Sequence, residues 1–167
     1  MNKINSSFWQ EQVRQLPVLL QKCDTKREFI TAALRNIVEG LSLKRATHLT
    51  CLLEETRVDC EVSAETFPAD RDFATRKSSE LRLLLANIIL ERASQRCLEK
   101  VLTVEGENLN VKAFQIRLPE SATQHILILT APEKGTEVSQ LSEDDKQAGF
   151  DYLIRLAEVA ASIKAKS

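Results

Sequence analysis

The sequence contains little glycine and proline, and this scarcity limits the kinds of protein it can encode. Only four glycines and four prolines occur among the 167 residues. Flexible linkers and low-complexity segments are much richer in such residues, so none is expected here. No glycine-rich phosphate loop is present either. The length of 167 residues predicts one domain with a substantial core.

Long apolar runs and a strong net charge are also absent. No apolar stretch approaches the roughly 20 residues that span a bilayer, and residues 1–6 lack the apolar core of an export signal. The formal net charge of −1 provides no excess of positive charge that would attract nucleic acid or an anionic membrane. We therefore expect a cytoplasmic protein with neither nucleic-acid nor membrane partners.

The four cysteines have none of the spacings that bind metal or form a disulfide framework. Cys23, Cys51, Cys60 and Cys97 include no CxxC pair and fall in regular elements. This pattern predicts buried, reduced thiols. Cys51 and Cys60 face each other in the hairpin described below, and a redox pair is the alternative for these two positions.

No residue set resembles a catalytic or metal site. The sequence has no Ser-His-Asp arrangement and no Cys-His nucleophile spacing. His48 and Cys51 are three residues apart on an expected strand, so they point to opposite faces and cannot share a metal. The acidic residues near expected helix starts are explained by capping and the helix dipole. We expect no catalytic residues, no metal and no cofactor.

Two helices are expected before the first strand. In the first, Trp9, Val13, Leu16 and Leu20 recur at helical spacings, and Pro17 predicts a kink or a division into two short helices.

The second helix begins at a capping box formed by Thr25 and Glu28. Its apolar face is wide enough to lie on a sheet, and Gly40 is expected to end it.

Strict alternation of apolar and charged residues predicts a hairpin across residues 48–65. With a turn at residues 55–56, the two apolar rows coincide in only one register parity. That register pairs Leu49 with Val62, Cys51 with Cys60, and Leu53 with Val58.

The rest of the chain predicts a helix, three strands and a closing helix. Residues 79–97 form an expected helix that is apolar almost all round. Strands follow between residues 100 and 130, with a bulge at Ala113–Phe114 where the alternation changes phase. The strand at 124–130 is apolar on both faces and is expected to be central. Leu141–Asp145 opens the closing helix.

This order of elements, together with local motifs, resembles GAF domains. Residues 29–53 are similar to the family's opening helix and first strand, and residues 114–129 to its fourth and fifth strands. Residues 141–145, followed by an alanine-rich helix, resemble its closing helix. The resemblance covers residues 24–165 and implies a sensory or interaction module.

Several features of that family are missing. Asp144–Asp145 alone does not reproduce the cyclic-nucleotide signature, and Cys97 precedes Leu98 rather than the histidine common in bilin-binding members. In GAF domains the sheet face away from the terminal helices borders the ligand pocket. The resemblance places the row His48, Thr50 and Leu52 on that face, as candidate ligand-binding residues.

The two terminal helices carry apolar ridges that match each other in spacing. Packing of the ridges within one chain is the simplest outcome, but a twofold four-helix bundle would also bury them. We expect such a homodimer. The candidate interface residues are Trp9, Val13, Leu16, Leu20, Tyr152, Leu156, Val159 and Ile163.

The sequence thus predicts an α+β, GAF-like domain at residues 24–167 with a helical extension at 1–23. A central antiparallel sheet of about five strands carries the terminal helices on one face and the middle helix on the other. The predicted function is a noncatalytic regulatory or sensory module, homodimeric and able to bind a small ligand. Two alternatives remain: a small thiol-dependent enzyme of the methionine-sulfoxide-reductase kind, and a pure interaction scaffold with a filled pocket.

Overall fold

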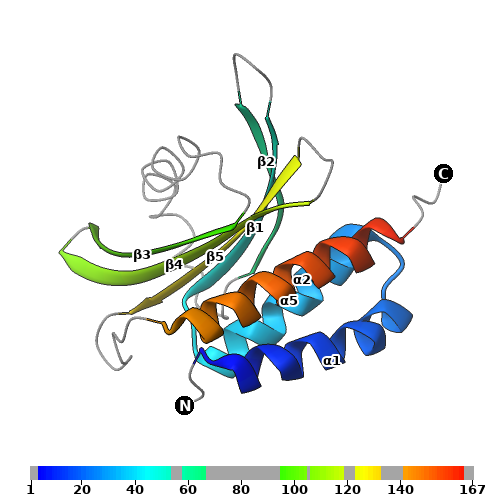
Figure 1. Cartoon of the computed structure of the whole chain (residues 1–167), viewed down its shortest axis with the longest axis horizontal. Coiled ribbons are helices and arrows are strands. Elements are labelled where there is room, and N and C mark those ends of the chain that lie inside the picture. Colours follow the sequence, from blue (N-terminus) through cyan, green and yellow to red (C-terminus); the bar gives the residue numbers. More distant parts are fainter. Residues whose placement is uncertain are drawn as a thin grey trace.

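The computed structural model is an α+β fold in which the described helices lie on one side of an antiparallel sheet (Figure 1). It describes residues 4–53, 58–66, 95–104, 106–118, 123–132 and 141–163. The helices are α1 (Ser6–Lys22), α2 (Lys26–Leu41) and α5 (Glu143–Ala161). The strands are β1 (Arg45–Leu53), β2 (Val58–Thr66), β3 (Gln95–Val104), β4 (Glu107–Arg117) and β5 (Thr123–Pro132).

The five strands lie in the order β2-β1-β5-β4-β3, and every neighbouring pair is antiparallel. β5 is the middle strand, as its two apolar faces predicted. The hairpin register is also confirmed, because the strand pairs match Leu49 with Val62, Cys51 with Cys60 and Leu53 with Val58.

Two details of the strands differ from the sequence prediction. β4 pairs without any register shift along its whole length, so the bulge expected at Ala113–Phe114 is wrong. The change of phase arises because Ala113 and Phe114 are both buried, on opposite faces of the sheet. The strand pairing of the hairpin does shift its register, between His48 and Leu49.

The expected middle helix lies largely outside the described residues. Its predicted end, however, is wrong, because β3 already begins at Gln95 and includes Cys97. Among the described helices, none is long and apolar enough to cross a membrane.

Local capping explains where α2 begins and ends. Thr25 Oγ1 accepts a hydrogen bond from the Glu28 N–H, and Glu28 Oε2 accepts one from the Asp24 N–H. The helix passes through Gly40 and stops at Leu41, because Ser42 adopts a left-handed conformation with φ of 54°. Gly40 has a packing role instead: a Cβ there would lie 3.0 Å from Phe8 Cε2.

The helices form two layers on the sheet. α2 packs against β1 and β2, α5 packs against β4 and β5, and α1 packs against α2 and α5 (Figure 1). α1 runs through Pro17 as one helix, so it is not divided. Its Trp9 reaches down to the sheet, where its ring centroid lies 5.5 Å from that of Phe114.

The starts of α1 and α5 are joined by a polar contact. Asp145 Oδ1 accepts hydrogen bonds from the Ser6 N–H at 3.0 Å and from the Ser6 hydroxyl at 3.1 Å. Ser142 caps α5, and Glu143, Asp144 and Asp145 occupy its first turn, where acidic side chains complement the helix dipole. The two helices therefore run side by side from a common end.

Candidate functional site

Strand pairing divides the sheet side chains between two faces. Ala46, Phe114, Leu127 and Leu129 belong to the large core cluster that includes the helices. Side chains alternate along a strand, so their neighbours point the other way. We call the sheet side opposite α2 and α5 the distal face. Its described side chains are Arg45, Thr47, Leu49, Cys51, Arg96, Leu98, Lys100, Leu109, Val111, Ala113, Gln115, Arg117, Gln124, Ile126, Ile128 and Thr130.

The middle of the distal face is an apolar cluster separate from the main core. It consists of Leu49, Cys51, Leu109, Val111, Ala113, Ile126 and Ile128, all buried, with Leu98 packed against them. The cluster lies on the side of the sheet opposite α2 and α5, so packing against these two helices does not account for it.

Buried polar side chains interrupt this cluster. Gln115 Nε2 donates a 2.7 Å hydrogen bond to Gln124 Oε1, and each residue is only 1% exposed. At the other end, Arg45, Thr47 and Thr130 are also buried. Burying polar groups beside apolar ones costs free energy unless they are hydrogen-bonded. Such groups are typical of sites that recognise a polar part of a ligand.

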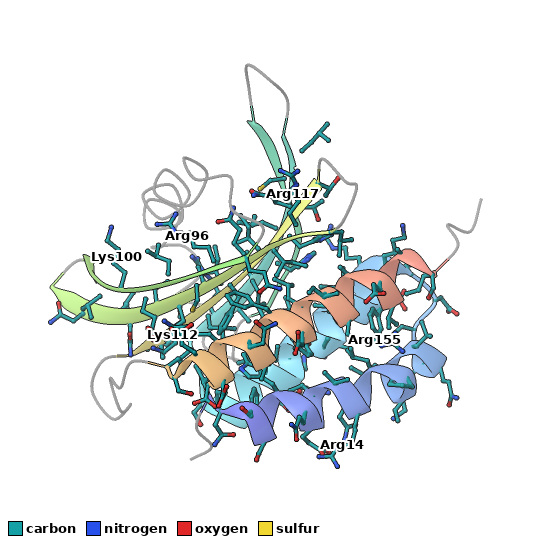
Figure 2. The ribbon with its side chains drawn as sticks, in the orientation of Figure 1. Arg14, Arg96, Lys100, Lys112, Arg117 and Arg155 are labelled. Carbon is teal, nitrogen blue, oxygen red and sulfur yellow. The ribbon has the colours of Figure 1, made fainter. Side chains whose placement is uncertain are left out.

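The charged side chains described on the distal face are all cations, namely Arg45, Arg96, Lys100 and Arg117. Figure 2 shows Arg96 and Lys100 projecting from β3 away from the helices, whereas Lys112 points toward them. Lys112 forms a 2.7 Å ion pair with Glu99. Glu99 also accepts a hydrogen bond from the Leu141 N–H, so the ion pair ties the start of α5 to the sheet edge.

The predicted ligand-binding row lies on the other side of the sheet. His48 pairs with Leu127, and both flank Ala46 and Leu129 of the main core, so His48, Thr50 and Leu52 are on the helix-bearing face. His48 is buried, Thr50 is half-buried, and Leu52 is exposed. The sequence prediction therefore placed this row on the opposite face of the sheet from the one it occupies.

His48 lies beside His125. The His48 Nε2 and His125 Nδ1 atoms are 3.3 Å apart, and the two rings stack with centroids 5.4 Å apart. Burial lowers the pKa of His48 to about 3, with a further contribution from His125. Burial also lowers the pKa of His125, so both imidazoles are neutral near pH 7.

The candidate dimer residues fall into two groups. Trp9, Leu16, Tyr152 and Leu156 are at most 1% exposed within the single chain. The other four, Val13, Leu20, Val159 and Ile163, are half-buried and pack against the same core. The two ridges therefore pack on each other inside the chain, and only the second group keeps surface for another molecule.

The cysteines differ from the expected set of reduced thiols. Cys51 is disulfide-bonded, whereas Cys23 and Cys97 are free thiols. The Cα atoms of Cys51 and Cys60 are paired across the hairpin, and directly opposed antiparallel positions lie within disulfide range. The prediction of a reduced thiol is therefore wrong for Cys51.

Neither free thiol is activated. Burial raises the pKa of Cys97 to about 12, with a smaller contribution from Glu99. Burial and the carboxylates of Glu28 and Asp24 raise the pKa of Cys23. A nucleophilic cysteine needs a lowered pKa, which neither of these has. Among the described residues, no group of three or more histidine, cysteine, aspartate and glutamate side chains could hold a metal.

Solved structures share this architecture at low sequence identity. The GAF domain of a phosphoenolpyruvate-protein phosphotransferase from Coxiella burnetii superposes with a TM-score of 0.57 at 10% identity, covering 94% of this chain and 95% of its own. A phycoerythrobilin-bound GAF domain from a cyanobacterial phytochrome gives a TM-score of 0.53 at 13% identity, with coverages of 92% and 94%. The fold is that of a GAF domain.

A transcription factor has a similar fold. The N-acylhomoserine lactone-dependent LuxR-family protein CepR2 from Burkholderia cenocepacia gives a TM-score of 0.52 at 10% identity, covering 94% of this chain and 95% of its own. No family model matches the sequence, and no curated protein does.

The sequence interpretation missed the polar residues of the distal face. Gln115 and Gln124 lie within apolar strands, at positions that strand alternation predicts to be buried. A polar side chain at such a position is the feature that could have identified them. The sequence alone could not show on which face of the sheet the two glutamines lie, because that depends on which side the helices cover.

Proposed function

We propose that this GAF-like domain is a noncatalytic sensory or regulatory module that binds a small molecule against the distal face. The observation that carries the proposal is the buried Gln115–Gln124 hydrogen bond beside a separate apolar cluster. Ligand sites are mostly apolar and contain a few placed polar groups that fix orientation. Two structures with this fold agree with the proposal, since one is bound to phycoerythrobilin and one depends on an acylhomoserine lactone.

The test uses a neutral, apolar fluorescent probe, Nile red, and a variant that fills the face. Ala113 is 1% exposed in the middle of the apolar cluster. Wild-type protein is expected to bind Nile red saturably, and Ala113→Leu is expected to reduce that binding by roughly tenfold or more, since it occupies ligand space. Ala161→Leu, the same change at an exposed position of α5, should leave binding unchanged.

Two results would count against this function. Without saturable Nile red binding to wild-type protein, the domain is better explained as an interaction scaffold with a filled interior. Equal binding to folded Ala113→Leu, verified by circular dichroism, would place the probe elsewhere on the molecule.

We also propose that the module forms a homodimer through the outer side of α1 and α5. These helices carry the half-buried residues Val13, Leu20 and Val159, with half-buried Ile163 just beyond the end of α5, and Val18 on α1 is 45% exposed. A second copy would cover this apolar surface at roughly 25 cal/mol per Å² buried. Sedimentation of wild-type protein against Val18→Glu tests the proposal, which predicts that the charge shifts the dimer toward monomer.

A further inference from the structure

We propose that the ligand is a small amphipathic acid, whose anionic group binds one polar corner of the distal face. The corner consists of Arg96, Gln115, Arg117 and Gln124. This inference rests on the proposed function, because it names the class of ligand that the same face would bind.

Strand register brings the four residues together from three neighbouring strands. Arg96 of β3 pairs with Gln115 of β4, and Arg117 of β4 pairs with Gln124 of β5. Directly opposed residues lie about 4.5–5.5 Å apart and share a face. The 2.7 Å bond between Gln115 and Gln124 joins the two pairs diagonally. The corner is therefore a compact group of two guanidinium and two amide side chains.

The hydrogen bond between the two side-chain amides has a defined direction. Gln115 Nε2 is the donor and Gln124 Oε1 the acceptor, so the Gln124 amide directs its N–H donors away from Gln115. Both amides are buried, while Arg96 is half-buried and Arg117 is exposed. Polarity thus increases from the interior of the face to its rim, as an acid with one apolar end requires.

The guanidinium groups supply the charge. Arginine presents a planar fork of donors that matches a carboxylate or phosphate, and charge-assisted hydrogen bonds are about twice as strong as neutral ones. The charged side chains described on this face are cations only, and cations on a partly buried surface raise the local concentration of anions.

The apolar body of the ligand would lie along the strands from this corner. Ala113, Ile126 and Ile128 continue the face directly beyond the two glutamines. A strand rises about 3.3 Å per residue, so the stretch of β5 from Gln124 to Thr130 is about 20 Å long. This length accommodates a decanoyl chain.

The experiment measures displacement of Nile red by three ten-carbon probes: decanoate, monodecyl phosphate and decan-1-ol, each below its micelle-forming concentration. We expect at least one of the anionic probes to displace Nile red at a concentration roughly tenfold or more below that of the alcohol. The ranking of the two anions then identifies the preferred acid.

Two matched double variants locate the anion. Arg96→Met with Arg117→Met should abolish the advantage of the anion over decan-1-ol and leave displacement by the alcohol unchanged. Arg14→Met with Arg155→Met removes two exposed cations from the helices and should preserve the advantage (Figure 2). Gln124→Leu provides a second test at the corner, with folding checked by circular dichroism, and should also weaken binding of the anion.

Three outcomes would overturn the proposal. These are displacement by the alcohol at the same concentration as the anions, no displacement by either anion, and an anion advantage that survives in the folded Arg96→Met, Arg117→Met variant. Nile red binding that persists in each case would leave the proposed function intact. Loss of Nile red binding in wild-type protein would instead reject the function itself.

Discussion

His48 and His125 stack on the helix-bearing face of the sheet, with His48 Nε2 3.3 Å from His125 Nδ1. Protonating either ring at this position is expected to destabilise the folded state. The His48 side chain is buried, and its Nδ1 has no hydrogen-bond partner among the residues that the structure describes. A charged imidazole there would be removed from water and would lie beside a second imidazole that offers no negative charge. The pair therefore stabilises the fold only while both rings are neutral.

This relationship predicts a defined acid sensitivity. An unfolded histidine titrates near pH 6.5, whereas the folded pKa of His48 is lowered to about 3. Between these values His48 binds more protons in the unfolded chain than in the folded one, so its contribution to the free energy of unfolding decreases as pH falls and levels off below about 3. The lowered pKa of His125 acts in the same direction.

Urea unfolding at pH 7, 6 and 5 measures the effect. One histidine contributes at most about 1.4 kcal/mol per pH unit. We expect His48→Gln to have a visibly shallower dependence than the wild type, since most carboxylates remain ionised in this range. Parallel curves for the two proteins would show that His48 titrates normally in the folded state.

The alternation of side chains along β1 shows why the fold could be predicted more fully than the candidate site. Alternation in the hairpin identifies which residues share a face, and that part was confirmed, with Cys51 opposite Cys60. It does not say which face the helices cover. Both faces of β1 are largely buried, with Leu49 on one and Ala46 and His48 on the other. Only the packing of α2 and α5 decides the assignment, and that information is tertiary.

The close approach of α5 to the sheet depends on Gly149. A Cβ at this position would lie 2.4 Å from Phe114 Cε1, so the helix or the ring would have to move. We expect Gly149→Ala to lower the free energy of unfolding by about 1–3 kcal/mol through overpacking, despite the better helix propensity of alanine. Chemical denaturation measures this change.

A double variant separates the clash from other effects of Gly149→Ala. Adding Phe114→Leu removes the ring that the new methyl group meets. The two substitutions together should therefore destabilise less than the sum of their separate effects. Strict additivity would mean that Gly149 acts through the backbone and not through this contact.

Tyr152 should be replaceable at little cost. Its ring packs on Trp9 with centroids 5.0 Å apart, but its hydroxyl is buried and has no hydrogen-bond partner among the described residues. Burial also raises the pKa of the hydroxyl, which stays protonated. Because Tyr152→Phe keeps the ring and removes an unsatisfied polar group, we expect unchanged or slightly higher thermal stability. A clear decrease in melting temperature would reveal a hydrogen bond at this hydroxyl.

The disulfide of Cys51 can be counted chemically. Four cysteines are present, and Cys51 is disulfide-bonded. Non-reduced protein in denaturant should therefore show fewer than four reactive thiols, and reduction should restore all four. Peptide mapping of the non-reduced protein would identify the cysteine bonded to Cys51. Four thiols before reduction, in protein purified without reductant, would contradict the bond.

Leu156 and Val159 separate the two roles that the terminal ridges could have. Leu156 is fully buried in the chain, whereas Val159 on α5 is half-buried and keeps part of its surface exposed. Leu156→Glu places a carboxylate in the core and should destabilise by more than about 3 kcal/mol, with loss of the folded state as one result. Val159→Glu should cost much less, because its carboxylate can reach water.

The same pair distinguishes packing inside one chain from packing between two. If Val159 also contacts a second copy, Val159→Glu should sediment as a folded monomer at a concentration where the wild type is a dimer. If the wild type is itself monomeric at tens of micromolar, the outer side of α5 is solvent-exposed, and the ridges serve the single chain alone. A folded, dimeric Val159→Glu protein would place any dimer contact on another surface, since a buried carboxylate in a symmetric interface is destabilising in both copies.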